Sequence, residues 1–473
     1  MPIPDSTWKS LFAPESVVVV GASNRLGSWG ERITSNLIAP GIRKVYAVNP
    51  GETEVRGLHS YKSVLDIDEP VELGVIVVRA ELVARTMREF VEKKIKAALI
   101  ISGGFGESDE AGAELEKEVT EIARSGGIRF IGPNTMGHLE TYSQLNTLSF
   151  VDKINSGPLA LIAQSGNMGT RIMHNTSQYG VGINRFVCCG NETDIKLEDY
   201  LDYFSRDPGT KIIMLYIEGL RDARRFFKLA KEITKTKPIV VMKAGGTENA
   251  ARASRSHTGA LAGSEAVYSA AFRQAGVIRV GDDEELLDIT IALLNQPLPR
   301  GNRVGVLTIG GGLGVVTAEA CEREGLDLAD LEQISLEKLD ELLPARWSHG
   351  NPVDLVGSSL AHSPEMASTL WILMEDNNLD AIISNAWIGR TDRRRSSDSG
   401  QAEDSMRSLR DEVKKYGKPF FMVGSPPQQV SELEAYNLYR RGGFSVFPQP
   451  ARAARTLGRL NWYRQYLEGV GGK

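Results

Sequence analysis

Short runs of apolar residues alternate with longer amphipathic stretches along most of the chain. The first apolar runs are residues 17–20, 44–50, 73–78, 97–102 and 129–134, and helical periodicity separates them at residues 30–37, 80–94 and 107–125. Continuous apolar strands that alternate with amphipathic helices indicate a parallel sheet covered on both faces. The pattern therefore predicts a doubly wound α/β domain at the start of the chain.

The same alternation restarts twice. Apolar runs at residues 158–163, 186–189, 211–217, 238–243 and 277–280 form a second set. Residues 303–309, 381–385, 419–423 and 444–447 form a third, followed by a helix near residues 451–467. Residues 295–302 are rich in proline and glycine, which is typical of a linker. We predict three consecutive α/β domains over residues 1–145, 146–297 and 298–473.

Composition and charge exclude several classes of protein. Of the 473 residues, 41% are hydrophobic and 24% charged, which is typical of globular proteins. The net charge of −5 provides no overall field for nucleic acid or anionic lipid. The sequence shows no apolar run near the ~20 residues of a membrane span and no signal-peptide pattern. Three cysteines without zinc spacing suit free thiols in a reducing cytoplasm, where we expect the protein to act.

A glycine-containing turn follows the first predicted strand. Gly21, Ala22, Ser23 and Gly27 permit backbone amides to approach a phosphate at a helix N-terminus. The spacing is not the dinucleotide GxGxxG, and Asn49 stands where an NAD site needs an acidic residue. These residues favour a nucleotide-like ligand other than NAD, and a tight turn without a ligand is the alternative.

A second strand–turn–helix junction carries Gln164, Ser165 and Gly166. It offers backbone amides and a hydroxyl at a helix start, but it lacks the lysine of a P-loop. Taken alone, this junction fits either a phosphate site or an ordinary helix cap.

The third element is a small, polar loop around His257, one of six histidines in the chain. A loop histidine is usually solvated and idle, but small neighbours allow phosphate oxygens to come close. Imidazole is a competent nucleophile toward phosphorus when a carboxylate fixes its tautomer. Glu218 follows the strand at residues 211–217, and the carboxyl ends of parallel strands share one edge. Glu218, Ser165 and the His257 loop are therefore expected to converge, although a strand-end carboxylate is also common without a function.

Together these residues resemble the α subunit of ADP-forming (NDP-forming) acyl-CoA synthetases, in the succinyl-CoA synthetase superfamily. The most specific motif is residues 256–263, Ser-His-Thr-Gly-Ala-Leu-Ala-Gly, supported by residues 132–134, 164–166, 216–219 and 351–354. The resemblance covers nearly the whole chain. It implies a Rossmann-like CoA-binding domain followed by two flavodoxin-like domains, and interconversion of acyl-CoA, ADP and phosphate with a carboxylic acid, ATP and CoA.

The resemblance also implies roles for individual residues. His257 becomes phosphorylated and Glu218 supports it. The implied phosphate-binding residues are Gln164, Ser165, Gly166, Ser256, Thr258 and Gly259. The implied CoA contacts are Gly21, Ala22, Ser23, Gly27, Asn49, Pro50, Arg79, Ser102 and Gly103, and Asn134 lies near the substrate. No metal ligand is expected in this chain.

Four positions depart from the pattern of the family. Glu52 follows Asn49-Pro50 where a basic residue is common, and Arg79 replaces a common proline. Thr135 stands in place of cysteine, and Gly246 in place of arginine. The departures suggest an unusual acyl group or reduced activity, with Arg79 supplying the missing charge for CoA.

The resemblance also points to a partner. Single-chain relatives append an ATP-grasp module, whereas three α/β domains use up this sequence. We therefore expect a separate ATP-grasp β subunit that carries ADP or ATP with Mg²⁺, in a hetero-oligomer such as a heterotetramer. Two alternatives stay open: an NAD-dependent dehydrogenase, and a catalytically silent CoA-binding regulator on the same scaffold.

Overall fold

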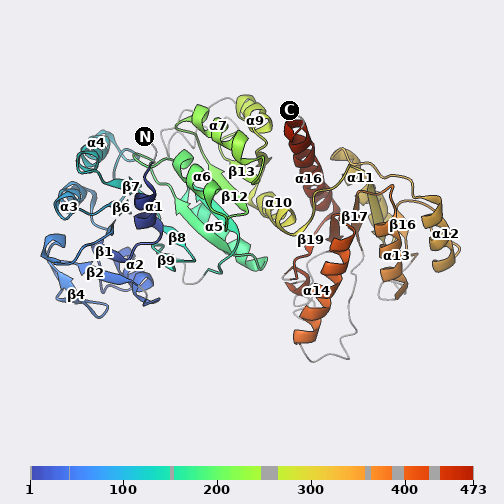
Figure 1. Cartoon of the computed structure of the whole chain (residues 1–473), viewed down its shortest axis with the longest axis horizontal. Coiled ribbons are helices and arrows are strands. Elements are labelled where there is room, and N and C mark those ends of the chain that lie inside the picture. Colours follow the sequence, from blue (N-terminus) through green and yellow to red (C-terminus); the bar gives the residue numbers. More distant parts are fainter. Residues whose placement is uncertain are drawn as a thin grey trace. The chain divides into compact units, whose positions relative to one another are not determined.

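The computed structural model describes residues 3–41, 43–149, 154–246, 265–356, 364–385, 399–424, 437–440 and 442–471. These residues form three sheets in which most neighbouring strands are parallel, which confirms the predicted α/β class (Figure 1). The chain divides into two compact units, one of residues 1–177 with 181–281 and the other of residues 178–180 with 282–473. The first two sheets belong to the first unit and the third sheet to the second.

The first sheet has the strand order β3-β4-β2-β1-β5-β6-β7, and only the β3–β4 pair is antiparallel. Its strands are β1 (Ser16–Val20), β2 (Lys44–Val48), β3 (Glu54–Val55), β4 (Leu58–Tyr61), β5 (Leu73–Ile76), β6 (Ala97–Ile100) and β7 (Arg129–Ile131). The accompanying helices are α2 (Trp29–Ile38), η1 (Val64–Asp66), α3 (Ala80–Glu92) and α4 (Glu110–Ser125). All five residues of β1 are buried, as expected of a strand covered on both faces.

The second sheet has the order β14-β13-β12-β10-β11-β8-β9. Its strands are β8 (His138–Glu140), β9 (Leu145–Asn146), β10 (Leu159–Ala163), β11 (Ile183–Cys188), β12 (Ile212–Ile217), β13 (Ile239–Lys243) and β14 (Ile278–Val280). Its helices are α5 (Gly166–Gln178), α6 (Leu197–Arg206), α7 (Ala223–Ile233) and α9 (Glu265–Gln274). The antiparallel strands β8 and β9 begin before residue 146, where we placed the start of the second domain, and yet they pair within the second sheet.

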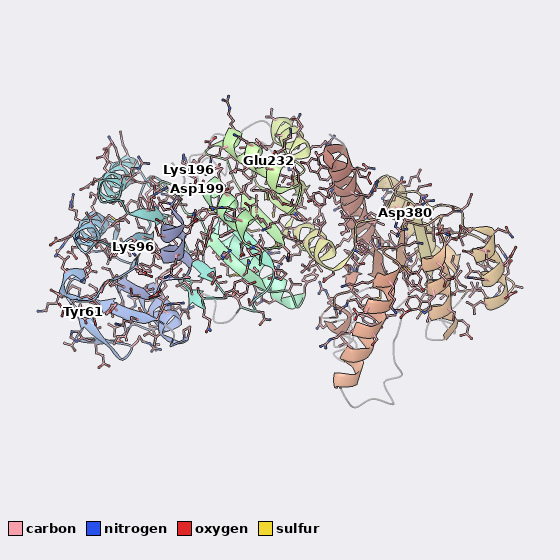
Figure 2. The ribbon with its side chains drawn as sticks, viewed as in Figure 1. Tyr61, Lys96, Lys196, Asp199, Glu232 and Asp380 are labelled. Carbon is pink, nitrogen blue, oxygen red and sulfur yellow. The ribbon has the colours of Figure 1, made fainter. Side chains whose placement is uncertain are left out.

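The third sheet is parallel throughout and has the order β16-β15-β17-β18-β19. Its strands are β15 (Val304–Thr308), β16 (Val353–Asp354), β17 (Ala381–Ser384), β18 (Phe420–Val423) and β19 (Ser445–Phe447). The helices of this unit are α10 (Asp283–Asn295), α11 (Gly311–Arg323), α12 (Gln333–Leu342), α13 (Pro364–Glu375), α14 (Ser399–Lys415) and α16 (Pro450–Gly471). Asp380, labelled in Figure 2, accepts hydrogen bonds from Arg303 Nε at 2.9 Å and Nη2 at 3.0 Å, which joins the beginnings of β15 and β17.

One hydrophobic core runs from the first sheet into the second. Helix α1 (Asp5–Phe12) lies in this core, and Trp8 stacks on Tyr203 of α6 with ring centroids 4.4 Å apart. The ring of His138 in β8 is fully buried, and its Nε2 lies 2.6 Å from the carbonyl oxygen of Leu11. Burial lowers the pKa of the His138 imidazole to about 4. The two domains of this unit therefore share their interior.

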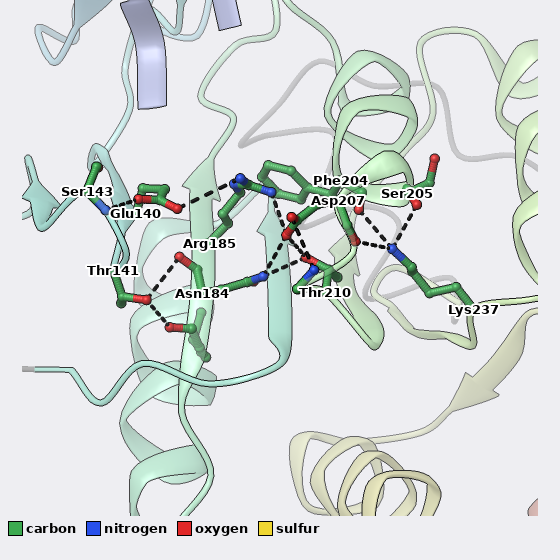
Figure 3. A network of polar contacts seen from close by, with 12 residues as sticks. Glu140, Thr141, Ser143, Asn184, Arg185, Phe204, Ser205, Asp207, Thr210 and Lys237 are labelled. Carbon is green, nitrogen blue, oxygen red and sulfur yellow. Dashed lines mark hydrogen bonds and ion pairs between the residues drawn. The ribbon is translucent and has the colours of Figure 1, made fainter. Parts of the chain in front are cut away.

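A polar network occupies the amino ends of β11 and β12 (Figure 3). Arg185 pairs with Asp207 at 2.7 Å, and Asp207 Oδ2 also accepts from Asn184 Nδ2 at 2.9 Å. Lys237 Nζ donates to three carbonyl oxygens at the end of α6, those of residues 204 and 205 in its last turn and of residue 207 just after it, at 3.2, 2.7 and 2.8 Å. Because a helix leaves its last carbonyls without partners, this ammonium group completes the end of α6.

Within the described residues, no helix combines the length and the apolar character needed to cross a bilayer.

Candidate functional site

The carboxyl edge of the first sheet begins with the turn after β1. Gly21 has φ +93°, and a Cβ built there would lie 2.5 Å from the carbonyl oxygen of Val77. Gly30, in the first turn of α2, comes so close that its Cβ would lie 2.0 Å from the Gly21 oxygen. Only glycine fits this close packing, which brings the start of α2 against the end of β1. The turn leaves space at the helix N-terminus where backbone amides attract an anion.

The other residues predicted to contact CoA follow neighbouring strands of the same edge. In the strand order they come after β2, β1, β5 and β6, which lie side by side. Asn49 Nδ2 donates to the Ala22 oxygen at 2.8 Å, and the Ser102 hydroxyl donates to the Val78 oxygen. Arg79 is exposed at the N-cap of α3. The structure thus brings the predicted CoA residues to one rim.

Arg56 is a basic residue at this rim that the sequence analysis missed. It lies in the β3–β4 hairpin with φ +51°, and its amide donates to Asn24 Oδ1 at 3.0 Å. Arg56 Nε is 3.7 Å from Glu31 Oε1, and Glu31 accepts from the Gly27 amide at 3.2 Å. The only signal in the sequence was the Arg-Gly pair of a two-residue hairpin turn, which says nothing about the neighbouring turn after β1.

The carboxyl edge of the second sheet is organised by the amide of Gln164, which follows β10. Gln164 Oε1 accepts from the backbone amides of Glu218 and Gly219 at 2.6 and 3.1 Å. Gln164 Nε2 donates to the Gly219 oxygen at 2.7 Å and to Glu192 Oε1 at 3.1 Å. Both donors and both acceptor positions of this amide are therefore used within the protein. Gln164 was expected to bind phosphate; in the structure its amide holds the segment that carries Glu218.

Ser165 and Gly166 follow at the start of α5. Ser165 Oγ lies 3.5 Å from the Met168 amide, and a Cβ on Gly166 would lie 2.0 Å from Met136 Sδ. The close contact with Met136 sets the first turn of α5 directly against the end of the first domain. The amides of this turn remain oriented toward the carboxyl edge, where a helix N-terminus favours negative charge.

Glu192 was also missed, although it follows β11 at the same edge. Glu192 is only 4% exposed and has φ +56°. Burial raises the pKa of the Glu192 carboxyl to about 7, against an opposing effect of the hydrogen bond from Gln164. A carboxyl group that is buried at a strand end and changes charge near neutral pH is a candidate functional group.

A chain of contacts joins the two edges. The Asn134 amide donates to the Ser102 oxygen at 2.9 Å, and Asn134 Nδ2 donates to Asn191 Oδ1 at 3.3 Å. Asn191 Nδ2 in turn donates to Glu107 and Glu116, at 2.6 and 2.7 Å. Asn191 contacts Asn134 at the rim predicted for CoA, and the next residue, Glu192, contacts Gln164 at the second edge. These two adjacent residues therefore link the rim to Gln164.

His257, Ser256, Thr258 and Gly259 lie outside the described residues. Of the departures from the family pattern, Thr135 is buried, and its hydroxyl donates to the Cys188 oxygen and accepts from the Gly137 amide. A Cβ on Gly246 would lie 2.8 Å from Glu265 Oε2, so a longer side chain there needs Glu265 to move. Among the described residues, no group of three or more His, Cys, Asp or Glu side chains is arranged to hold a metal.

Comparisons with known proteins agree with this arrangement. Residues 15–140 match the CoA binding domain family and residues 156–293 the succinyl-CoA ligase like flavodoxin domain family. The α subunit of ADP-forming acetate–CoA ligase II from Pyrococcus furiosus is 38% identical over 468 residues, covering 98% of each chain. The chain belongs to the α subunits of ADP-forming acyl-CoA synthetases.

The α subunit of the ligase I isoenzyme from the same organism is also 38% identical, over 96% of each chain. The solved structure of a dinucleotide-forming acetyl-coenzyme A synthetase from Ca. Korarchaeum cryptofilum, in complex with phosphate and ADP, superposes with a TM-score of 0.86 at 31% identity and covers 99% of both chains. This family membership confirms the resemblance seen in the sequence. It favours neither the dehydrogenase nor the silent regulator.

Proposed function

We propose that this α subunit binds acyl-CoA and phosphate and passes a phosphoryl group through His257 to ADP on a partner subunit. One observation carries the proposal: the rim with the predicted CoA residues and the edge with Glu218 are joined through Asn134, Asn191 and Gln164. The two half-reactions are thus served by neighbouring parts of one compact unit. Family membership supports the same assignment.

The first step takes place at the CoA rim. A phosphate oxygen attacks the thioester carbonyl carbon, a C–O bond forms and the C–S bond breaks. The proton of the phosphate moves to the CoA sulfur, so that acyl phosphate and CoA result. The glycine turn after β1 fits the diphosphate of CoA, because the close packing of Gly21 and Gly30 brings the N-terminus of α2 to the end of β1. Arg56 and Arg79 supply positive charge in the absence of a basic residue after Pro50.

The second step forms the covalent intermediate. A ring nitrogen of His257 attacks phosphorus, the P–N bond forms, and the P–O bond to the acyl group breaks with its electron pair leaving on the carboxylate. Glu218 accepts from the other ring N–H and stabilises the positive charge on the ring. The α5 amides at Ser165 and Gly166, with Ser256, Thr258 and Gly259, hold the phosphoryl oxygens.

The third step uses the partner. The terminal oxygen of ADP attacks phosphorus, the P–N bond breaks, and neutral imidazole returns. We assign ADP and Mg²⁺ to an ATP-grasp β subunit in a cytoplasmic hetero-oligomer, where the metal neutralises phosphate charge. The names of the two Pyrococcus relatives as α subunits support a partner for this chain.

Mass spectrometry of the intact protein tests the relay. After incubation with a panel of acyl-CoA thioesters and phosphate, the wild type is expected to gain an acid-labile phosphoryl group. His257→Ala removes the nucleophile and should abolish the adduct, whereas His174→Ala, an exposed residue of α5, should retain it. Glu218→Gln should slow its formation about 100-fold, the usual range for a positioned catalytic group. An adduct that persists in His257→Ala shows that another residue carries the phosphoryl group. A wild-type protein that binds CoA but forms no phosphoryl adduct is instead a silent regulator.

A further inference from the structure

The amide of Gln164 has no hydrogen-bonding capacity left for a ligand. Three of its four hydrogen bonds go to the backbone of Glu218 and Gly219, and the fourth goes to Glu192. An amide side chain has two nearly equivalent orientations, and its partners decide which one it adopts. The carboxyl of Glu192 accepts from the nitrogen and so supports the orientation in which the oxygen of Gln164 faces the amides of Glu218 and Gly219.

The loop after β11 holds Glu192 in place. Gly190 and Glu192 both have positive φ, at +64° and +56°, and a Cβ on Gly190 would lie 2.2 Å from the Pro133 oxygen. A non-glycine residue in this conformation is strained, and such outliers cluster at functional sites. The loop is also anchored from outside, because Asn191 donates to Glu107 and Glu116 of the first domain.

The surroundings of Glu192 oppose its charge. Burial and the charge of Glu198 in α6 raise the pKa of the carboxyl, while Arg221, which follows β12, and the Cys189 thiol, which follows β11, act in the other direction. Tyr200 of α6 shares this buried region, and the Glu192 charge contributes to raising the pKa of its phenol. Burying a carboxyl group is costly, and packing alone is served as well by an apolar side chain of the same size. Packing therefore does not explain a buried acid at this point, whereas a role in positioning does.

We propose that Glu192 is a positioning residue of the phosphorylation step: through Gln164 it holds the backbone of Glu218 and Gly219 at the carboxyl edge of the second sheet. The proposal rests on the function proposed above and names a further residue for the same site. Glu192 need not touch the substrate, because its effect passes through one hydrogen bond. The adjacent residue, Asn191, contacts Asn134 at the CoA rim. One loop therefore connects the proposed CoA site with the proposed phosphorylation site.

Two substitutions separate the hydrogen bond from the charge. Glu192→Met keeps the length and removes the acceptor, so the Gln164 amide loses one of the four hydrogen bonds that hold it. Glu192→Gln keeps a carbonyl acceptor for Gln164 Nε2 and removes the charge. Glu140→Gln is the matched control, since Glu140 is also a buried carboxyl group but belongs to β8 and hydrogen-bonds the Ser143 amide, away from Gln164.

The experiment measures the rate of acid-labile phosphoryl incorporation by quenched flow, using the chain with its partner subunit and the acyl-CoA on which the wild type is fastest. Glu192→Met is expected to be slower by about 10- to 100-fold, the loss typical of a catalytic group that is slightly misplaced. Glu192→Gln should restore the rate to within about threefold of the wild type below pH 7, and Glu140→Gln should leave it unchanged. The dissociation constant for CoA should stay within about twofold in each variant, because the CoA rim is left intact.

Two further readouts exclude a merely structural role. In a Gln164→Met background, Glu192→Met should add less than about a twofold loss, because the two residues act as one unit. The ratio of the Glu192→Gln rate to the wild-type rate should rise from about pH 6 to about pH 8, because ionised Glu192 adds negative charge at the edge where the proposed function uses an anionic phosphoryl group. The ionisation of phosphate changes both rates by the same factor, so it does not affect their ratio.

Each result decides the question. Additive losses in the double variant, a flat rate ratio, or a Glu192→Met enzyme as fast as the wild type overturns the role of Glu192. A wild-type enzyme that forms no phosphoryl adduct overturns the proposed function instead, so the two failures are distinguishable.

Discussion

At the scale of single residues, His138 shows how a buried titratable group makes stability depend on pH. Its pKa of about 4 in the folded protein lies below the ordinary value of 6.5, because burial disfavours the charged ring. The unfolded chain therefore takes up a proton first as the pH falls. The stability contributed by the neutral ring is complete above about pH 6.5 and is lost as the pH falls toward about 4.

This loss is measurable against a variant that does not titrate. His138→Gln keeps an N–H donor for the Leu11 oxygen. By linkage, the difference in unfolding free energy between the wild type and His138→Gln should shrink by about 2 kcal/mol from about pH 7.5 to about pH 5. Urea unfolding followed by circular dichroism measures it. The comparison between variants is needed because Glu192, with its raised pKa, titrates in the opposite sense. A difference that is the same at both pH values contradicts the assignment of His138 as buried and neutral.

At the scale of elements, the end of α6 depends on a side chain from a distant part of the sequence. Lys237 Nζ reaches the carbonyl oxygens of Phe204, Ser205 and Asp207, where the helix dipole favours positive charge. Lys237→Met keeps the aliphatic stem and leaves these carbonyls without their donor. We expect the free energy of unfolding to fall by about 2 to 3 kcal/mol, the range for hydrogen bonds to a charged group.

Lys235→Met is the control for that substitution. Lys235 lies two residues away and pairs with Glu232 at 2.7 Å on the exposed surface. Such surface pairs contribute little, so the change should stay below about 0.5 kcal/mol. Equal effects of the two substitutions in urea unfolding show that Lys237 does not complete the end of α6.

The sequence predicted the central strands well, because each is a continuous apolar run that the sheet buries on both faces. Strands β1, β10 and β15 are of this kind. The missed strands β3, β4, β8, β9 and β16 have two to four residues and include polar side chains. Their pairing depends on neighbours that are distant in sequence, so no local periodicity reveals them. Helix α1 was missed for a related reason: its role is to cover a core built by later residues.

At the scale of the whole molecule, the proposed function divides the chemistry between this chain and a partner. We expect the purified chain, given acyl-CoA, ADP and phosphate, to form the phosphoryl adduct but no ATP. Addition of an ATP-grasp subunit should start ATP formation, because the phosphohistidine then has an acceptor site for ADP. A coupled luciferase assay measures ATP directly, and His257→Ala with the partner is the control. ATP formation by the chain alone contradicts the division.

The candidate site was only partly predictable for the same reason as the fold. The rule that parallel strands end at one edge predicted that Ser165 and Glu218 lie close together, and Gln164, the neighbour of Ser165, hydrogen-bonds the Glu218 amide. Asn134 was expected near the substrate only from the family resemblance. Glu192 also follows a strand, but carboxylates follow many strands. What distinguishes it is burial and the contact with Gln164, and both arise only when two loops meet. Arg56 likewise reaches the rim only through the fold of a hairpin.

The hairpin β8–β9 and helix α1 have a consequence for how such subunits exchange parts by recombination. The segment that matches the CoA binding domain, residues 15–140, starts after α1 and stops at the last residue of β8. A gene fragment with those limits would leave Trp8 and Leu11 behind and would separate β8 from β9. Chimeras that exchange the CoA-binding domain between relatives should therefore have their crossover points before Asp5 and after Asn146. The exchanged segment then includes α1 and both strands of the β8–β9 hairpin.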